Sequence, residues 1–234
     1  MNIIIFGPNG SGKGTQGSIL QKELSLSPIE SGNIFRENVK QQTDLGKRAQ
    51  AFLRQGDLVP DEITIPMVLN CLAEVRVQTG WLLDGFPRNV RQAQKLWEAL
   101  AFRQLMVDFI IEIELDQDIA KKRIMGRRIC ASDPTHSNNL YMDGFAPVKL
   151  NNRELCQVCR SSLHAREDDL NESSIDKRHK IYYDEMNGTK AAVNWLRDNA
   201  HSRGTKLLSV DGKPTVAEVT RQLLDKLCCS QKTN

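Results

Sequence analysis

Short apolar runs recur along the chain, and longer stretches of helical character lie between them. Four runs, "NIIIF", "WLLD", "DFIIEIEL" and "KLLSV", predict strands buried on both faces, and "PIES" predicts a shorter fifth. These strands cover residues 2–6, 81–84, 108–115, 206–210 and 28–31. Helices are predicted over 13–24, 61–75, 89–102, 116–128 and 215–227. This alternation predicts an α/β fold of three layers, α/β/α, around a parallel five-stranded sheet.

Two segments interrupt this alternation. Residues 31–59 predict a small helical insertion, with Gly46 and Gly56 as helix breakers. Residues 129–165 are rich in Asn, Ser, Pro and Cys and have no long helical period. A structureless loop of that length is unusual in a compact domain, so this segment needs a staple of its own.

Composition narrows the classes of function. The 234 residues are 40% hydrophobic and 26% charged, with a net charge of +3, which is ordinary for a globular protein. The chain has neither the basic stripe of a nucleic-acid binder nor an apolar run of the roughly 20 residues that a membrane span needs. Its start, "MNIIIFGPNG", lacks the basic region of a secretory signal. We therefore expect a cytoplasmic protein with no nucleic-acid or membrane partner, whose six cysteines are thiols or metal ligands.

The stretch "GPNGSGKGTQ" (7–16) follows the first predicted strand and opens a helix. Its glycines let backbone N–H groups approach phosphate oxygens, and Lys13 can reach the β- and γ-phosphates. A generic phosphate loop has Ser or Thr directly after the lysine. Here Gly14 follows, and the hydroxyl comes one place later, on Thr15. The shift disfavours a generic ATPase or switch, in which that hydroxyl holds magnesium.

A second stretch, "LLDGFPR" (82–88), places Asp84 at the carboxyl end of a buried strand, where open α/β sheets bind their ligands. A carboxylate there can organise the waters of Mg²⁺, and Arg88 follows in the next turn. Arginines recur at other loop and helix ends, and phosphoryl transfer needs several fixed cations. They are Arg36, Arg123, Arg127, Arg166 and Arg178.

The whole chain resembles the adenylate kinase family, in its long-lid form of nucleoside monophosphate kinase. The motifs that carry this resemblance occur in the family's order and spacing. They are "GPNGSGKGTQ", "SGNIFR" (31–36), "GDLVPDE" (56–62), "WLLDGFPR" (81–88) with Gln92, "RIMGRR" (123–128) and "REDD" (166–169). The resemblance implies a monomer that transfers a phosphoryl group reversibly from Mg-ATP to AMP, giving two ADP.

The resemblance also implies a role for each matching position. ATP-binding residues would be Gly10, Ser11, Gly12, Lys13, Gly14, Thr15, Arg123, Arg127 and Pro214. AMP-binding residues would be Ser31, Arg36, Asp57, Leu58, Val59, Gly85, Phe86, Pro87, Arg88, Gln92, Arg166 and Arg178. Lys13, Arg88, Arg127, Arg166 and Arg178 would act in catalysis, and Asp84 with Thr15 would organise Mg²⁺. Residues 1–30, 60–126 and 166–234 would form the core, 31–59 the AMP-binding arm and 127–165 the lid.

Three positions depart from the family's pattern. Asn33 stands where the family usually has Asp, so a charge near the AMP site is lost. Ser31 replaces the usual Thr but keeps its hydroxyl. One extra residue separates Arg166 from Arg178, which makes the assignment of Arg178 less direct.

Three other functions are compatible with parts of the pattern. A kinase for another nucleoside monophosphate is the nearest alternative, although Ser31 and the long lid favour AMP by resemblance. A GTPase switch should carry an Asn-Lys-x-Asp stretch, which the chain lacks. A zinc-ribbon nucleic-acid module should interleave basic and aromatic residues in 129–165, which is instead rich in Asn and Ser.

The cysteines of the lid predict a metal staple. Cys156 and Cys159 have the spacing of a metal knuckle, and Cys130 with His136 would complete a tetrahedral site of three thiolates and one imidazole. His164 competes for the fourth position, but His136 shares a short turn with Cys130. A full protein ligand set indicates a structural site, with Zn²⁺ as the default and Co²⁺ or Fe²⁺ as alternatives.

Overall fold

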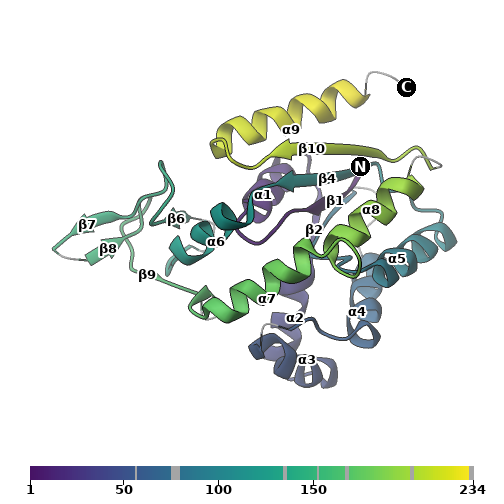
Figure 1. Cartoon of the computed structure of the whole chain (residues 1–234), viewed down its shortest axis with the longest axis horizontal. Helices are drawn as coiled ribbons and strands as arrows, with labels where there is room; N and C mark the ends of the chain where they lie inside the picture. The colour runs from purple at the N-terminus through teal and green to yellow at the C-terminus, as the bar shows by residue number, and fades with distance from the viewer. Residues whose placement is uncertain are drawn as a thin grey trace.

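A five-stranded parallel sheet forms the centre of the computed structural model, which describes residues 1–55, 57–74, 80–133, 136–151, 153–166, 169–200 and 203–231. The strand order is β10-β4-β1-β3-β2, and every adjacent pair is parallel (Figure 1). The strands are β1 (Asn2–Phe6), β2 (Ser27–Glu30), β3 (Trp81–Asp84), β4 (Phe109–Glu114) and β10 (Lys206–Asp211). The predicted sheet is confirmed, with strand ends shifted by one residue at most.

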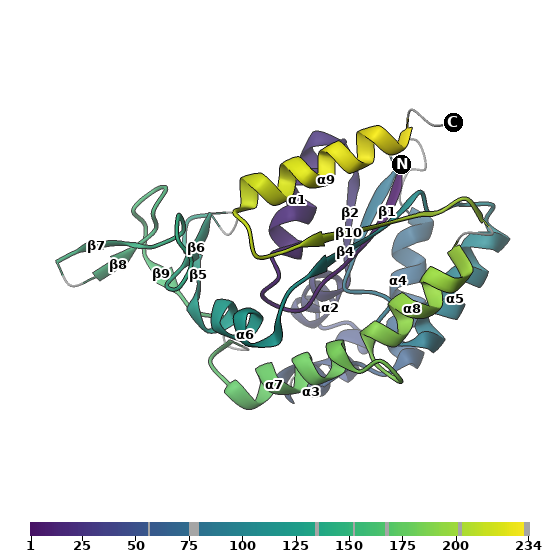
Figure 2. The same cartoon turned by 45° about the horizontal axis from the view of Figure 1, so that its top comes forward.

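Helices cover both faces of this sheet, which gives the predicted three layers (Figure 2). One layer holds α1 (Lys13–Glu23) and α9 (Val216–Gln231), and the other holds α4 (Asp61–Glu74), α5 (Val90–Phe102) and α8 (Thr189–Ala200). Side chains alternate along β1 between the layers: Ile3 and Ile5 pack with Leu20 of α1, whereas Ile4 and Phe6 pack with α5 and α8. This alternation explains why β1 is apolar throughout.

The helix predicted over 116–128 is too long at its carboxyl end. Helix α6 (Gln117–Gly126) stops two residues earlier, and Arg127 and Arg128 begin β5 (Arg127–Cys130). These two arginines pair with Asn139 and Asn138 on the neighbouring strand, so tertiary pairing overrides local helical preference. The sequence pattern also predicts no helix over 172–200, whereas the structure has α7 (Glu172–Tyr183) followed by α8 there.

The helical insertion consists of α2 (Ser31–Lys40) and α3 (Asp44–Gln55). Gly46 is not a breaker, because it lies within α3, and Gly56 lies outside the described residues. A β-carbon on Gly46 would come 2.1 Å from the Asn38 carbonyl oxygen, so this glycine allows α2 and α3 to approach closely. The chain reverses instead around Gln42, which has a positive φ of 56°.

The segment without helical period folds into short strands that project from the rest of the molecule (Figure 1). Strands β6 (Ser137–Asn139), β5 and β9 (Leu163–His164) form one small sheet, and β7 (Val148–Leu150) pairs with β8 (Arg153–Leu155). Among the described helices, none combines the length and apolarity that a membrane span requires.

Candidate active site and metal centre

The carboxyl ends of the parallel strands bring the predicted phosphate-site residues together. The phosphate loop runs from β1 into α1, which begins at Lys13, and Asp84 ends β3. Lys13 Nζ lies 3.8 Å from Asp84 Oδ1. Glu30 ends β2 in register with Asp84, so two carboxylates occupy this edge beside the lysine.

Burial shapes the charges at this edge. It lowers the pKa of Lys13, and the nearby Asp84 carboxylate opposes that effect. Burial likewise lowers the pKa of the Arg88 guanidinium, again opposed by Asp84. Burial raises the pKa of Glu30, and repulsion from Asp84 adds to the increase. Cations that have lost part of their hydration in this way gain most from a polyanionic ligand such as a nucleotide phosphate.

Asp84 has capacity for a further interaction. Within the described part of the chain, its buried Oδ1 accepts no hydrogen bond, although Lys13 lies close by. Carboxylate oxygens are the ligand type that suits hydrated Mg²⁺. Asp84 therefore fits a magnesium–nucleotide complex at this edge of the sheet.

The "DGFPR" turn is fixed by hydrogen bonds to the Gly85 carbonyl. Ser31 Oγ donates to that oxygen at 2.8 Å and Arg88 Nε at 2.9 Å. The backbone N–H of Arg88 donates to Gln92 Oε1 at 2.7 Å, and Gln92 Nε2 donates to Asp61 Oδ1 at 2.7 Å. Gln92 is 1% exposed, and the peptide bond between Phe86 and Pro87 is cis. Hydrogen bonds thus join four of the predicted AMP-site residues, namely Ser31, Gly85, Arg88 and Gln92, and Phe86 beside them is buried.

Arg36 is held indirectly by a carboxylate. Its guanidinium donates to Asn33 Oδ1, and Asn33 Nδ2 donates to Glu30 Oε2 at 2.6 Å. The negative charge that Asn33 lacks is therefore supplied nearby by Glu30, one residue before Ser31. The side-chain amide of Asn33 links that charge to Arg36.

The Asp169 carboxylate contacts two of the predicted catalytic arginines. Arg127 donates to it from Nε at 2.7 Å and from the guanidinium terminus at 2.8 Å, in the bidentate geometry that orients arginine best. Arg178 NH2 lies 3.7 Å from Asp169 Oδ1. Asp169 is 5% exposed and ends the "REDD" motif, whose Glu167 and Asp168 lie outside the described residues, while Arg166 is exposed. The sequence pattern contains this motif but predicts no role for Asp169.

Arg123 lies beside the loop that contains Pro214. Its guanidinium donates to the carbonyls of Gly212 and Lys213 at 2.7 and 3.0 Å. Arg123 and Arg127 lie four residues apart, one in α6 and the other at the start of β5, so they reach different neighbours. Arg123 contacts the loop after β10, whereas Arg127 binds Asp169.

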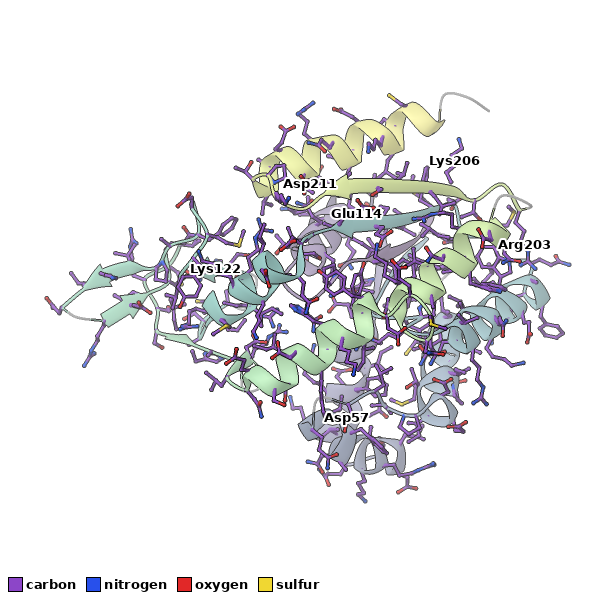
Figure 3. The ribbon with its side chains drawn as sticks, viewed as in Figure 1. Asp57, Glu114, Lys122, Arg203, Lys206 and Asp211 are labelled. Carbon is purple, nitrogen blue, oxygen red and sulfur yellow. The ribbon has the colours of Figure 1, made fainter. Side chains whose placement is uncertain are left out.

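The remaining predicted AMP-site residues lie at the carboxyl-terminal end of the arm. Asp57, labelled in Figure 3, accepts a hydrogen bond at Oδ1 from Lys177 Nζ of α7 at 2.8 Å, which ties the arm to the core. The Val59 side chain is 5% exposed and packs with Phe35 of α2 and Ile63 of α4, where the arm meets the core. Its side chain therefore supports the arm, and Leu58 beside it is half-buried.

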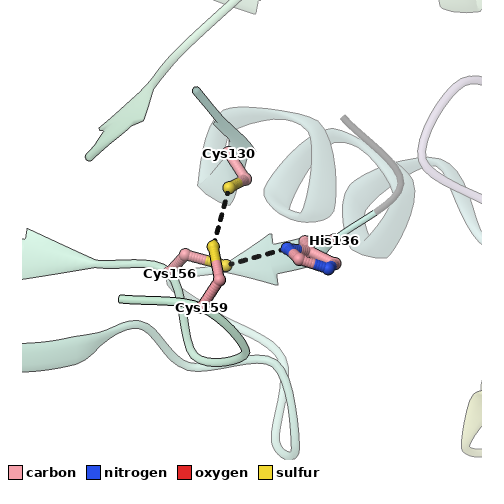
Figure 4. Close-up of side chains that lie close together, drawn as sticks. All are labelled: Cys130, His136, Cys156 and Cys159. Atoms are coloured by element: carbon pink, nitrogen blue, oxygen red, sulfur yellow. Dashed lines mark hydrogen bonds between the residues drawn. The ribbon is translucent and has the colours of Figure 1, made fainter. Parts of the chain in front are cut away.

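Four side chains of the projecting segment converge on one point. The ligand atoms of Cys130, His136, Cys156 and Cys159 all lie within 4.8 Å of one another (Figure 4). Cys130 Sγ is 3.4 Å from Cys159 Sγ, and His136 Nδ1 is 3.7 Å from Cys156 Sγ. These are the four residues that the spacing predicted. His164 instead lies on β9, paired with Ile129.

The surroundings of this cluster suit a metal with thiolate ligands. His136 Nε2 lies 3.4 Å from Asp133 Oδ2, which orients the imidazole with Nδ1 toward the sulfurs. Asn138 Nδ2 donates to Cys156 Sγ at 3.4 Å. The Ser161 side chain and backbone lower the pKa of the Cys159 thiol to about 6. Three sulfurs and one imidazole are a ligand set typical of structural zinc sites.

Comparison with known proteins decides the family. The family model described as adenylate kinase matches residues 5–198. An adenylate kinase from Desulforapulum autotrophicum is 51% identical over 228 residues, which cover 97% of this chain and 100% of that protein. An adenylate kinase from Nitratidesulfovibrio vulgaris is 51% identical over 227 residues, with the same coverage. The chain belongs to the adenylate kinase family. This protein is therefore a nucleoside monophosphate kinase, an enzyme that transfers phosphoryl groups between nucleotides.

Proposed function

We propose that this adenylate kinase binds ATP on the phosphate-loop side of Asp84 and AMP on the arm side, so that their phosphates meet beside Lys13 and Arg88. The reaction of the family is reversible, Mg²⁺-dependent phosphoryl transfer from ATP to AMP giving two ADP, which balances the adenine nucleotides. The observation that carries the proposal is the position of Lys13. It lies 3.8 Å from Asp84, at the edge where the loop and the "DGFPR" turn meet.

Catalysis needs no protein nucleophile, because an oxygen of the AMP phosphate attacks the γ-phosphorus of ATP. The bond from that phosphorus to the β–γ bridging oxygen breaks, and ADP leaves. The protein contributes alignment and fixed positive charge. Mg²⁺ bound to ATP supplies further charge neutralisation, and Asp84 with Thr15 would hold its water ligands. The lid and the arm exclude water, which would otherwise compete with AMP.

Each predicted residue keeps its proposed role. The loop residues Gly10–Thr15 bind ATP phosphates, Arg123 and Arg127 close over ATP, the backbone near Pro214 lies against the adenine, and Arg166 and Arg178 bridge the phosphates of the two nucleotides. Ser31, Arg36, Asp57–Val59, Gly85–Arg88 and Gln92 bind AMP. Support comes from the hydrogen bonds that join Ser31, Arg88 and Gln92, and from the Asp169 carboxylate shared by Arg127 and Arg178. We retain 31–59 as the arm and 127–165 as the lid, the rest being core.

The lid cluster is proposed to hold a structural Zn²⁺, with Co²⁺ and Fe²⁺ as alternatives. Support comes from the convergence of Cys130, His136, Cys156 and Cys159, a complete set of four protein ligands. Ligation would cross-link a segment that contributes little apolar core of its own, and so stabilise the lid.

The protein is further proposed to act as a cytoplasmic monomer. Support for a reducing compartment comes from its six cysteines, all of which are free thiols. A monomer suffices for the proposed site, because every residue assigned to it belongs to one chain.

The nucleotide assignment is tested by two arginine variants that should separate the substrates. Arg88→Ala should raise KM for AMP by about 10- to 100-fold, because it removes a charged donor from the AMP side. Arg123→Ala should raise KM for ATP and leave KM for AMP nearly unchanged. Initial rates measured with each nucleotide varied in turn give both constants. If the two variants affected the same substrate, the proposed sides would be wrong.

A further inference from the structure

A buried histidine connects the phosphate loop to the helix that carries Arg178. His179 of α7 is 0% exposed, and its Nε2 lies 3.0 Å from the backbone carbonyl oxygen of Asn9, 170 residues earlier in the chain. A carbonyl oxygen can only accept, so Nε2 carries the proton and donates. Burial lowers the pKa of His179, which agrees with a neutral imidazole.

The other ring nitrogen gives no second anchor. Within the described part of the chain, the buried Nδ1 has no hydrogen-bond partner, and the ring meets Tyr183 edge-on at 5.9 Å between centroids. A buried imidazole with one nitrogen unsatisfied stabilises the fold less than a well-packed leucine of similar size would. The contact that distinguishes histidine from leucine here is the donation to Asn9.

That contact falls on the part of the loop that must present its N–H groups to phosphate. The only cis peptide in the described residues is at Pro87, so the Asn9–Gly10 peptide is trans. In a trans peptide, the carbonyl and the following N–H point in opposite directions. When His179 holds the Asn9 carbonyl, it also fixes the direction of the Gly10 N–H.

The same peptide is restrained from a second side. Gly10 has a φ of 92°, and a β-carbon there would lie 2.3 Å from the Ala120 carbonyl oxygen of α6. The loop at Gly10 is thus held closely against α6, while His179 of α7 fixes the neighbouring carbonyl. Helix α7 also presents Arg178, next to His179 in sequence, toward Asp169.

We propose that His179 is a positioning residue for ATP binding: its neutral imidazole donates from Nε2–H to the Asn9 carbonyl and so orients the Gly10 N–H toward the ATP phosphates. This rests on the proposed role of the loop in binding ATP. The hydrogen bond acts on the loop before the reaction and touches neither substrate. Its effect should therefore appear in ATP affinity and leave AMP affinity unaltered.

The test compares four variants with the parent protein. His179→Leu removes the donor at similar volume, and His179→Asn keeps an amide too short to replace Nε2. His179→Gln places its amide nitrogen at about the reach of Nε2. Tyr182→Phe is the matched control, because it removes a different buried hydrogen bond from the same helix, the one to Glu112 at 3.1 Å. Each protein is assayed with ATP and AMP varied in turn, and its unfolding temperature is measured.

We expect His179→Leu and His179→Asn to raise KM for ATP about tenfold, while KM for AMP stays within about twofold of the parent value. His179→Gln should restore most of the ATP affinity, and Tyr182→Phe should lower the unfolding temperature without changing KM for ATP. If His179→Leu does not fold, the comparison of Asn with Gln decides. Equal constants for Asn and Gln, or equal effects on ATP and AMP, would overturn the proposal. Failure of the ATP role itself is distinguishable, because Arg123→Ala, the variant that tests the ATP side, would then leave KM for ATP unchanged.

Discussion

At the scale of single residues, Lys13 is the side chain whose loss should lower the catalytic rate most. It is the cation nearest to Asp84 among the described contacts, and burial has removed part of its hydration. A charge in that position is worth more than one in water when a phosphoryl group passes between two nucleotides. Lys13 and Asp84 could be identified from sequence, because a motif and a strand end fix their places.

We expect Lys13→Met to lower kcat by about 1000-fold, because methionine keeps the length of the side chain and removes its charge. The unfolding temperature should stay close to that of the parent, since the one ion pair found for the lysine ammonium among the described residues is the 3.8 Å pair with Asp84. A coupled assay of ADP formation, together with thermal unfolding, measures both. A variant that retained a tenth of the parent's kcat would contradict the role given to Lys13.

Other site residues could not be found from sequence because their partners are distant along the chain. Asp169 binds Arg127 across 42 residues, and His179 reaches Asn9 across 170. Neither contact belongs to a local pattern, and each depends on where α6 and α7 come to lie. Glu30 is similar: its link to Arg36 runs through Asn33 and becomes visible only once the side chains are placed.

At the scale of elements, the sheet was the easiest part to predict. Strands buried on both faces need continuous apolar runs, and the chain has four of them, with the shorter "PIES" segment as the fifth strand. The end of α6 was harder, because Arg127 and Arg128 are good helix formers that pair as a strand with Asn139 and Asn138. Helix α7 was missed because its sequence, "ESSIDKRHKIYY", is strongly polar at its start.

The lid is the element whose stability should depend on metal. Removing the metal with a chelator should lower the unfolding temperature by about 10 °C, because the four ligands tie β5, β6 and the turn after β8 together. Cys156→Ser should give the same loss and reduce metal content. Metal analysis and differential scanning calorimetry follow both effects.

An exposed cysteine outside the cluster supplies the control for that measurement. Cys228→Ser on α9 should keep both the metal content and the unfolding temperature of the parent. The metal assignment would be wrong if Cys156→Ser bound metal as tightly as the parent protein, or if both serine variants lost it equally.

At the scale of the whole molecule, the proposed function requires two nucleotide sites, one on each side of the edge that carries Asp84 and Glu30. We assign the phosphate loop and Arg123 to ATP, and the "DGFPR" turn with the arm to AMP. Asp169 binds both Arg127, the first residue of β5, and Arg178 of α7. A protein that only hydrolysed ATP would have no need of the second side. The account therefore depends on the identity of the acceptor.

The most direct test is the rate of ATP-dependent transfer to AMP, CMP, UMP and GMP, with a reaction lacking any acceptor. The account predicts that AMP gives a kcat/KM at least about 100-fold above each of the others, because a site that hydrogen-bonds one base leaves polar groups unpaired with another. It also predicts negligible ATP consumption without acceptor. Preference for a different monophosphate, or equal ATP consumption in the absence of AMP, would contradict it.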